Sequence, residues 1–213
     1  MKSFLIVNPK GGSGKSTLAT NLAGYFAHRG YCAMLGDIDN QHSTRDWLTI
    51  RPPTLPPILD WHPGKASTGK KGYPAPASES TTRAVLDTPA GLHGRALENA
   101  LSQVGHVIVP IQPSLFDILA TRQFLETLLS MERVRRGRLR VAIVGMRVDA
   151  RTRAAGELTR FLSVYGLPPL TYLRDTQLYI QAAANGMTLF DLPPARIAKD
   201  LEQWQPLVSW VEG

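Results

Sequence analysis

A short glycine-rich segment near the start of the chain constrains the fold more than any other feature. It runs from Lys10 to Thr17 and reads Lys-Gly-Gly-Ser-Gly-Lys-Ser-Thr. It follows an apolar run at residues 4–7 and precedes a helical pattern over residues 15–28. Glycines let the main chain curl until its N–H groups face one point, and the next helix adds partial positive charge there. The sequence therefore predicts a buried strand, an anion-binding loop and a helix in direct succession.

Short apolar runs alternate with longer helical patterns along most of the chain. The runs lie at residues 4–7, 33–36, 84–86, 107–111 and 141–145, and the helical patterns at about 15–28, 94–103, 115–134 and 152–164. Parallel strands need crossover connections, which helices supply. We therefore expect an α/β fold, a doubly wound and mostly parallel sheet with helices on both faces. With 213 residues and no internal repeat, we expect a single domain over residues 1–213.

Residues 51–82 interrupt this alternation. The segment holds seven prolines with Gly, Ser and Lys between them, a composition that cannot continue a helix or a central strand. We expect a surface excursion from the domain. The alternative is a loop that contacts a partner or DNA, because Lys65, Lys70 and Lys71 lie in it.

Composition excludes several classes of protein. Hydrophobic residues make up 43% of the chain and charged residues 19%, as in globular proteins. The single cysteine, Cys32, rules out an internal disulfide framework and an all-cysteine metal cluster within one chain, and it favours a reducing cytoplasm. The apolar run near the N-terminus has four residues, too few for a signal peptide or a membrane span. A net charge of +7 is compatible with a polyanionic partner.

The glycine-rich segment also carries the side chains of a nucleotide-binding loop of the Walker A type. In that pattern Lys15 reaches the β- and γ-phosphates, the Ser16 hydroxyl joins the Mg²⁺ shell, and Thr17 can bond a further phosphate oxygen. The predicted phosphate-binding residues are Lys10, Gly11, Gly12, Ser13, Gly14, Lys15, Ser16 and Thr17.

With its first lysine, the segment resembles the loop of the ParA/MinD branch of P-loop ATPases, the deviant Walker A family. Other P-loops lack that lysine. The resemblance implies that Lys10 crosses a dimer interface onto the partner's nucleotide, where it would neutralise charge on the transferred phosphoryl group. It also implies ATP and Mg²⁺ as cofactors and a homodimer that holds the nucleotides between its subunits.

Two further motifs resemble this family in order and spacing. Asp37-Ile38-Asp39-Asn40 looks like its DxDP segment, which implies that Asp39 orients the attacking water and helps hold the Mg²⁺ hydration shell. Asn40 replaces the usual proline, which leaves the conformation of that loop open. Asp87, at the end of the run 84–86, resembles the Walker B aspartate, which binds Mg²⁺ through water. The expected metal ligands are Ser16, Asp39 and Asp87, and the expected catalytic residues are Lys10, Lys15 and Asp39.

The resemblance is weaker in the C-terminal half. Met146 and Arg147 follow a late strand, where relatives place residues against adenine, and Pro193 is a second candidate wall for the base. Ordinary loops at strand ends are the alternative. The segment Arg174-Asp175-Thr176 looks like the entry of a helix with an interface role.

Basic residues gather between residues 131 and 160. This stretch holds three acidic residues and nine arginines: Arg133, Arg135, Arg136, Arg138, Arg140, Arg147, Arg151, Arg153 and Arg160. ParA-like ATPases bind DNA without sequence preference in their ATP-bound state, and arginines on phosphates would suit such binding. The alternative is a solvated helix end, where cations are also favoured.

The last segment, residues 195–211, carries apolar residues at helical spacing. A MinD-like protein would use such a helix to bind a membrane, with Lys and Arg beside the apolar face. Here the polar side offers mostly Asp, Glu and Gln, so we expect packing against the domain and no membrane partner.

Together these features predict a small ParA-like ATPase that partitions or positions a cargo. The cargo could be a plasmid, a chromosome locus or a protein assembly. A ParB-like protein or cargo adaptor would stimulate hydrolysis, and the protein would be cytoplasmic and nucleoid-associated when ATP-bound.

The alternatives are a MinD-like membrane-cycling ATPase, a P-loop kinase acting on a small molecule, or a nucleotide-gated scaffold. A kinase would not need Lys10. An iron–sulfur ATPase would need two cysteines per subunit, and the chain has only Cys32.

Overall fold

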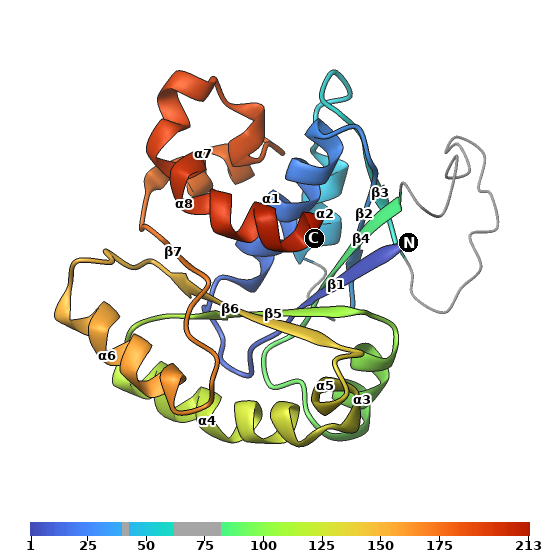
Figure 1. The fold of residues 1–213 in the computed structure, drawn as a ribbon. Coiled ribbons are helices and arrows are strands. Elements are labelled where there is room, and N and C mark those ends of the chain that lie inside the picture. Colours follow the sequence, from blue (N-terminus) through green and yellow to red (C-terminus); the bar gives the residue numbers. More distant parts are fainter. Residues whose placement is uncertain (40–42, 62–81) are drawn as a thin grey trace.

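A parallel sheet of seven strands forms the centre of the protein (Figure 1). The computed structural model describes residues 1–39, 43–61 and 82–213. The strands lie in the order β3-β2-β4-β1-β5-β6-β7. Their bounds are β1 (Lys2–Ile6), β2 (Cys32–Asp37), β3 (Ile58–Asp60), β4 (Thr82–Asp87), β5 (His106–Ile111), β6 (Arg140–Met146) and β7 (Thr171–Leu173).

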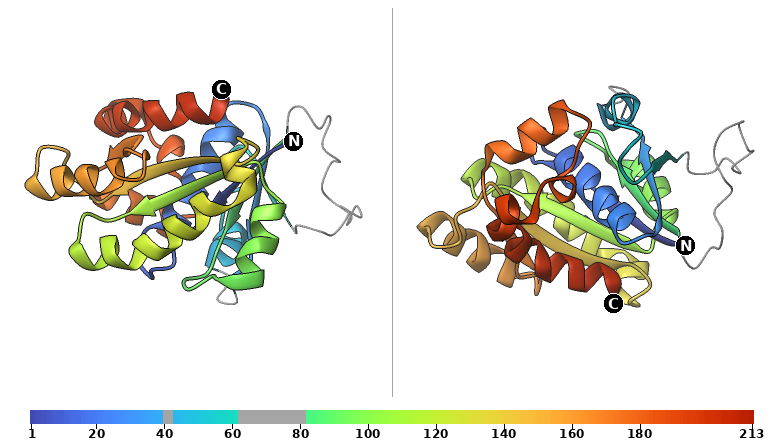
Figure 2. Two further views of the ribbon diagram at one scale, coloured as in Figure 1. Left: turned by 60° about the horizontal axis from the view of Figure 1, so that its bottom comes forward. Right: turned by 90° about the horizontal axis from the view of Figure 1, so that it is seen from above.

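Helices cover both faces of this sheet (Figures 1 and 2). One face carries α1 (Lys15–His28), α2 (Ser43–Thr49), α7 (Gln177–Ala184), the 3-10 helix η2 (Leu189–Asp191) and α8 (Pro194–Glu212). The other carries α3 (Gly94–Ser102), α4 (Leu115–Ser130), α5 (Glu132–Arg135) and α6 (Arg153–Ser163). The prediction of a doubly wound α/β fold is confirmed.

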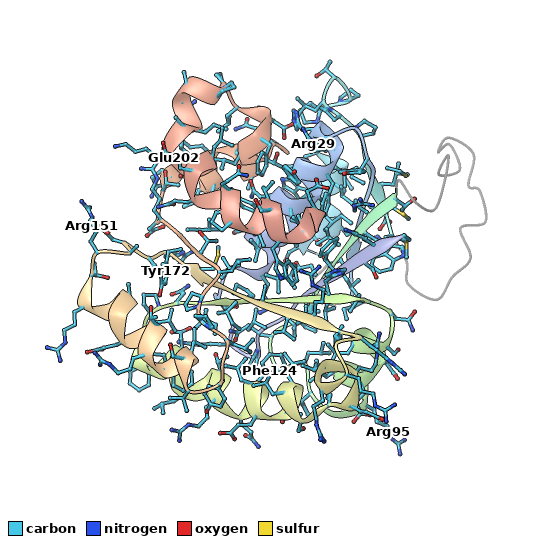
Figure 3. All side chains as sticks on the ribbon, viewed as in Figure 1. Arg29, Arg95, Phe124, Arg151, Tyr172 and Glu202 are labelled. Atoms are coloured by element: carbon cyan, nitrogen blue, oxygen red, sulfur yellow. The ribbon has the colours of Figure 1, made fainter. Side chains whose placement is uncertain are left out.

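The central strands are buried on both sides. Phe4 and Ile6 of β1 pack with α1 and α8, and Leu5 and Val7 pack in the opposite core against α3 and α4. Figure 3 shows Phe124 of α4 beneath the sheet, where it belongs to this second core. Burial on both faces explains why these strands appear in the sequence as continuous apolar runs.

The structure differs from the expected elements in two places. The helix expected over 115–134 is divided, because Met131 has extended backbone angles and separates α4 from α5. The excursion expected over 51–82 contains β3, which pairs with β2 as an edge strand, and Thr82 already belongs to β4. Residues 62–81, including Lys65, Lys70 and Lys71, lie outside the described residues.

The C-terminal helix packs against the domain, as its polar face predicted. Trp204 of α8 is 1% exposed, and its Nε1 donates a hydrogen bond to the Tyr179 hydroxyl of α7. Asp200 of α8 is buried and accepts two hydrogen bonds from the Arg174 guanidinium. In the described parts of the chain, none of the helices is both long and apolar enough to cross a membrane.

Candidate nucleotide-binding site

The loop between β1 and α1 has the conformation that its glycines permit. Gly12 and Gly14 adopt positive φ angles of 74° and 93°, in the left-handed region that other residues avoid. Gly14 precedes the first turn of α1, whose leading N–H groups have no partner within a helix. The carboxyl-terminal ends of β1, β2 and β4 lie together at this edge of the sheet.

A cleft of about 310 Å³ opens in front of this loop. This volume lies at the lower end of the range for small-molecule sites. Eleven residues line it: Gly11, Gly12, Ser13, Gly14, Lys15, Ser16, Thr17, Asp39, Thr88, Ala90 and Arg147. The structure therefore brings seven of the eight residues of the predicted phosphate loop to one cavity.

Lys15 is the buried cation among the residues that line the cleft. It is 7% exposed, and its Nζ donates a hydrogen bond of 3.0 Å across the loop to the carbonyl oxygen of Lys10. Burial lowers the pKa of Lys15, while the carboxylates of Asp87 and Asp39 act in the opposite direction. A bound polyphosphate would add negative charge beside this ammonium group and favour its charged form.

Ser13 carries an unused polar atom in the same loop. Its hydroxyl is buried, and the described residues offer it no hydrogen-bond partner. Buried polar atoms are otherwise almost always paired, so an orphan at the wall of a cleft indicates a place for a ligand atom. A phosphate oxygen could accept the hydrogen bond that this hydroxyl does not make within the described residues.

Two carboxylates, those of Asp87 and Asp39, lie close enough to Lys15 to act on its charge. Asp87 ends β4, is 2% exposed and accepts a hydrogen bond from the main-chain N–H of Thr88. Burial raises the pKa of Asp87 to about 7, although a hydrogen bond with the Ser16 hydroxyl acts to lower it. Asp39 lines the cleft itself.

The carboxylate of Asp37 holds the loop that carries Asp39. One carboxylate oxygen accepts from the N–H of Asp39, and the other accepts from the N–H and hydroxyl of Thr44. Asp37 thus ties the end of β2 to the start of α2 and fixes where Asp39 stands. Asn40, whose effect on this loop the sequence left open, lies outside the described residues.

The donors around the cleft suit Mg²⁺. Ser16, Asp87 and Asp39 supply hydroxyl and carboxylate oxygens, the ligands that this hard cation prefers. Within the described ranges, no three His, Cys, Asp or Glu side chains gather into a metal site. Mg²⁺ is commonly held by one or two carboxylates together with the phosphates of a nucleotide, so this donor set fits a metal that arrives with its ligand.

Lys10 points away from the cleft that Lys15 serves. Its Nζ lies 2.5 Å from an Asp117 carboxylate oxygen, in the first turn of α4. The same carboxylate accepts a close hydrogen bond from the Ser114 hydroxyl, and the N–H of Asp117 bonds back to that hydroxyl. The Lys10 side chain is 34% exposed, whereas that of Asp117 is 5% exposed. One loop therefore carries two lysines that diverge, one toward its own cleft and one toward α4.

The geometry agrees with a comparison of the whole chain with known families. The model described as "CobQ/CobB/MinD/ParA nucleotide binding domain" matches residues 4–189. The chain belongs to this family.

Individual members of this ParA/MinD group are distant from the chain in sequence. "Maintenance of carboxysome distribution protein A" of Halothiobacillus neapolitanus is 23% identical over 195 residues, which cover 89% of this chain and 87% of that protein. Cyanothece McdA in complex with ATP superposes with a TM-score of 0.69 at 17% identity, over 97% and 96% of the two chains. A putative plasmid partition protein of Borrelia burgdorferi bound to AMPPNP gives 0.67 at 16% identity, over 98% of each chain. At these identities the solved structures show a shared fold.

The residues predicted to contact adenine are dispersed in this ParA/MinD domain. Arg147 lines the cleft, has a positive φ of 56°, and lies 3.9 Å from Asp175. Met146 is buried beneath the phosphate loop, where a Cβ atom on Gly14 would come within 2.8 Å of its methyl group. Pro193 is exposed at the start of α8 and does not line the cleft. Of the three, only Arg147 meets the cleft, and contact with adenine remains a prediction.

The nine arginines of residues 131–160 do not form one surface in this domain. Strand β6 begins at Arg140 and ends at Met146, so it separates the group into two parts about 20 Å apart. The residues before it lie at the amino-terminal ends of the strands, and those after it lie at the phosphate-loop end. Figure 3 shows Arg151, a member of the second part, near α6; Arg95 of α3, which is not one of the nine, projects from the opposite side of the molecule.

Sequence reasoning missed the residues that hold the phosphate loop from outside. Gln112 donates a hydrogen bond to the carbonyl oxygen of Gly12. The Asn8 amide donates to the carbonyl oxygen of Pro110, and its oxygen accepts from the N–H of Lys10. Pro110 lies in β5 and Gln112 directly follows it, so these bonds tie the phosphate loop to the carboxyl end of β5.

Proposed function

We propose that this chain is an ATPase that dimerises around two ATP molecules and uses this switch to position a cargo. The observation that carries the proposal is the divergence of Lys10 and Lys15 from one loop. Lys15 is buried in the cleft, whereas Lys10 lies outside it with one third of its side chain exposed. A lysine in that place serves a nucleotide poorly in its own subunit and is available to a second one.

The proposed roles follow from the chemistry of each group. The main-chain N–H groups of the loop and Lys15 would hold the phosphates, and Ser16 with Asp87 would hold Mg²⁺. Asp39 would orient the attacking water. Lys10 of the partner subunit would neutralise the charge that develops on the transferred phosphoryl group, as an arginine finger does in other P-loop enzymes.

The proposed biological role is the distribution of a cargo along DNA. It is supported by the names of similar proteins, one for carboxysome distribution and one for plasmid partition. The ATP-bound dimer would bind DNA without sequence preference in the cytoplasm and so associate with the nucleoid. A ParB-like protein or cargo adaptor would stimulate hydrolysis and release the dimer.

A MinD-like membrane cycle has less support. The apolar residues of α8 that could enter a bilayer are used inside the protein: Ile197, Trp204, Leu207 and Val211 are each no more than 2% exposed. Membrane binding through this helix would require α8 to leave the core, at the cost of that buried apolar surface.

Binding to unrelated DNA duplexes tests the proposal most directly. It is measured with ATP, with ADP and without nucleotide across a salt series, together with the mass of the protein in each state by light scattering. We expect a dimer and tight DNA binding with ATP only. ATP that changes neither the mass nor DNA binding at low salt would contradict the switch.

A trapped variant gives a second, independent readout. Asp39→Ala should bind ATP and accumulate as a dimer, because hydrolysis is blocked while the phosphate loop is intact. If that variant stays monomeric with ATP, Asp39 does not have the proposed role.

A further inference from the structure

Four basic side chains lie together at the end of the sheet opposite the phosphate loop. Lys2 of β1 pairs with Arg83 of β4, Phe4 of β1 with His106 of β5, and His106 with Arg140 of β6. Neighbours in a parallel sheet share a face, as do residues two apart along a strand. Lys2, Arg83, His106 and Arg140 therefore share one face, and we call them the amino-edge cluster.

The members of this cluster are close enough to repel one another. Burial lowers the pKa of His106, a hydrogen bond to the carbonyl oxygen of Ser3 opposes that shift, and the charges of Arg140, Lys2 and Arg83 lower it further. His106 is therefore favoured in its neutral form. The three permanent cations create a positive field at this edge.

Arg140 is oriented by an aromatic ring instead of a carboxylate. Its guanidinium carbon lies 5.0 Å from the centre of the Trp210 ring, and that ring packs edge-on against His106. Arg140 is exposed, and within the part of the chain that the structure describes it has no carboxylate partner. A guanidinium held by cation–π contact keeps its N–H donors available for an anion.

The acidic side chain of Glu212, which senses the charge of Arg83, is already occupied. The two carboxylate oxygens of Glu212, at the end of α8, accept hydrogen bonds from the hydroxyls of Tyr25 and Tyr31. Lys2 bonds to the main-chain oxygen of Glu212, and its charge is therefore offset only in part by the end of the helix.

The turn that enters β6 extends the positive surface. Arg135 and Arg138 are exposed, and among the described residues neither forms an ion pair. The turn is fixed because the Arg133 guanidinium donates to the carbonyl oxygens of Leu101 and Val104, at the end of α3.

The arginines after β6 are arranged differently. Three of them have carboxylate partners: Arg147 with Asp175, Arg151 with Asp149, and Arg153 with Glu157. These carboxylates offset part of the arginine charge, so the positive field at that end of the strands is weaker than at the amino edge.

We propose that Lys2, Arg140, Arg135 and Arg138 form the surface that contacts the phosphate backbone of double-stranded DNA. This inference rests on the proposed function and names the part of the protein that carries out its DNA step. Four neighbouring strands span about 14 Å at 4.7–4.9 Å per step, so the cations sit on a rigid frame that can meet several phosphates. Contacts of this kind carry no sequence information, as the proposed function requires.

Other polyanions fit this surface less well. Trp210 is packed against Arg140 and His106 and is not available to stack on the bases of a single strand. For the same reason it cannot enter a bilayer as an aromatic anchor.

The position of the surface has a consequence for the switch. It lies at the far end of the strands from the cleft, so each subunit carries it whether or not nucleotide is bound. In a dimer joined at its two clefts these surfaces lie at opposite outer ends, so ATP would strengthen binding to long DNA by letting one dimer hold two DNA segments, an avidity effect.

Two triple variants of equal charge test the inference. The first, Arg135→Gln/Arg138→Gln/Arg140→Gln, removes cations before β6, and the second, Arg151→Gln/Arg153→Gln/Arg160→Gln, removes three after it. Binding to a DNA duplex is measured by fluorescence anisotropy with ATP and with ADP over a salt series. Because Arg140 also touches Trp210, the double variant Arg135→Gln/Arg138→Gln is included, and thermal unfolding and ATP binding of every variant are checked.

We expect the first triple variant to bind DNA about 10-fold or more weakly in both nucleotide states, and the double variant to show part of this loss. The slope of log K against log [salt] should fall by about 0.9 for each phosphate contact removed. The second triple variant should stay within about 3-fold of the wild type.

The inference is overturned if the first triple variant binds like the wild type, or if the second loses as much. It is also overturned if the wild type binds no duplex in any nucleotide state, or if the first variant loses binding only to RNA or to anionic vesicles. Failure of the proposed switch looks different, because ATP would then give no enhancement while the two variants still differ at low salt.

Discussion

Lys10 donates a hydrogen bond of 2.5 Å to Asp117, and this contact joins the phosphate loop to α4 across 107 positions of the sequence. The Asp117 carboxylate is buried at the start of the helix and also accepts from Ser114. In the proposed dimer Lys10 must reach the other subunit, so it has to leave this carboxylate. The contact therefore opposes dimerisation in each subunit.

Replacing Asp117 should make dimerisation easier. Asp117→Asn keeps the size of the side chain and removes its charge, so Lys10 is held less firmly. We expect the variant to dimerise with ATP at a several-fold lower protein concentration than the wild type, as measured by light scattering. Glu157→Gln, which removes the partner of Arg153 on exposed α6, is the matched control and should behave like the wild type. A variant that needs an equal or higher concentration would show that the contact does not restrain Lys10.

Lys10 and Lys15 should fail in different ways when each is replaced by alanine. Lys15→Ala removes the buried cation of the cleft and should abolish ATP binding. Lys10→Ala leaves the cleft intact, so its affinity for ATP should stay within about 3-fold of the wild type. Its turnover, at a protein concentration where the wild type is dimeric, should fall by about 10³-fold or more, the value of a cation supplied in trans.

The measurements are nucleotide binding by calorimetry and phosphate release at several protein concentrations. Lys199→Ala on the exposed side of α8 is the control for loss of one lysine. Turnover at the wild-type rate in Lys10→Ala would exclude the role in trans.

Hydrophobic pattern was enough to predict most of this fold. The helix expected over 15–28 is α1 (Lys15–His28). Four of the five apolar runs lie within strands, and the run 4–7 extends one residue past the end of β1. Buried parallel strands and an uninterrupted helix leave strong local signals. The three-residue strands β3 and β7 leave almost none, because their pairing depends on neighbours distant in sequence. The break between α4 and α5 at Met131 contains neither glycine nor proline, so it has no local signal in the sequence.

The site was predictable only where its residues are consecutive. The phosphate loop follows from one segment of eight residues, and its geometry follows from glycines at positions that need positive φ. The partner of Lys10 could not be predicted, because a contact between residues 10 and 117 exists only in three dimensions. The spacing Ser114-x-x-Asp117 is nevertheless typical of the start of a helix, and it could have predicted that a capped helix begins at this turn.

Gly24 should be intolerant of a side chain. It lies in α1 where the helix meets η2, and a Cβ atom there would overlap the side chain of Thr188. Overpacking of a well-filled core usually costs about 1–3 kcal/mol, so Gly24→Ala should lower the free energy of unfolding by about that amount. Gly156→Ala in α6 is the control, since no atom lies within 4 Å of its Cβ position, and alanine should stabilise that helix by about 0.5–1 kcal/mol. Equal urea midpoints for the two variants would contradict the close approach.

Asp87 should make the stability of the nucleotide-free protein depend on pH. Burial raises the pKa of its carboxyl group from 3.8 to about 7, so between these values the folded protein holds a proton that the unfolded chain releases. Stability contributed by this group is therefore greatest at low pH and declines as pH rises from about 4 to about 7. Asp87→Asn cannot lose a proton, so its free energy of unfolding should lack this decline and exceed that of the wild type by a growing margin toward pH 7. Urea unfolding of both proteins across this range measures the margin, and a margin that is constant or shrinks with rising pH would contradict the raised pKa.

Asp87→Asn should also weaken ATP binding more in the presence of Mg²⁺ than in the presence of EDTA. The neutral amide is a poorer partner for the hydrated cation than the carboxylate.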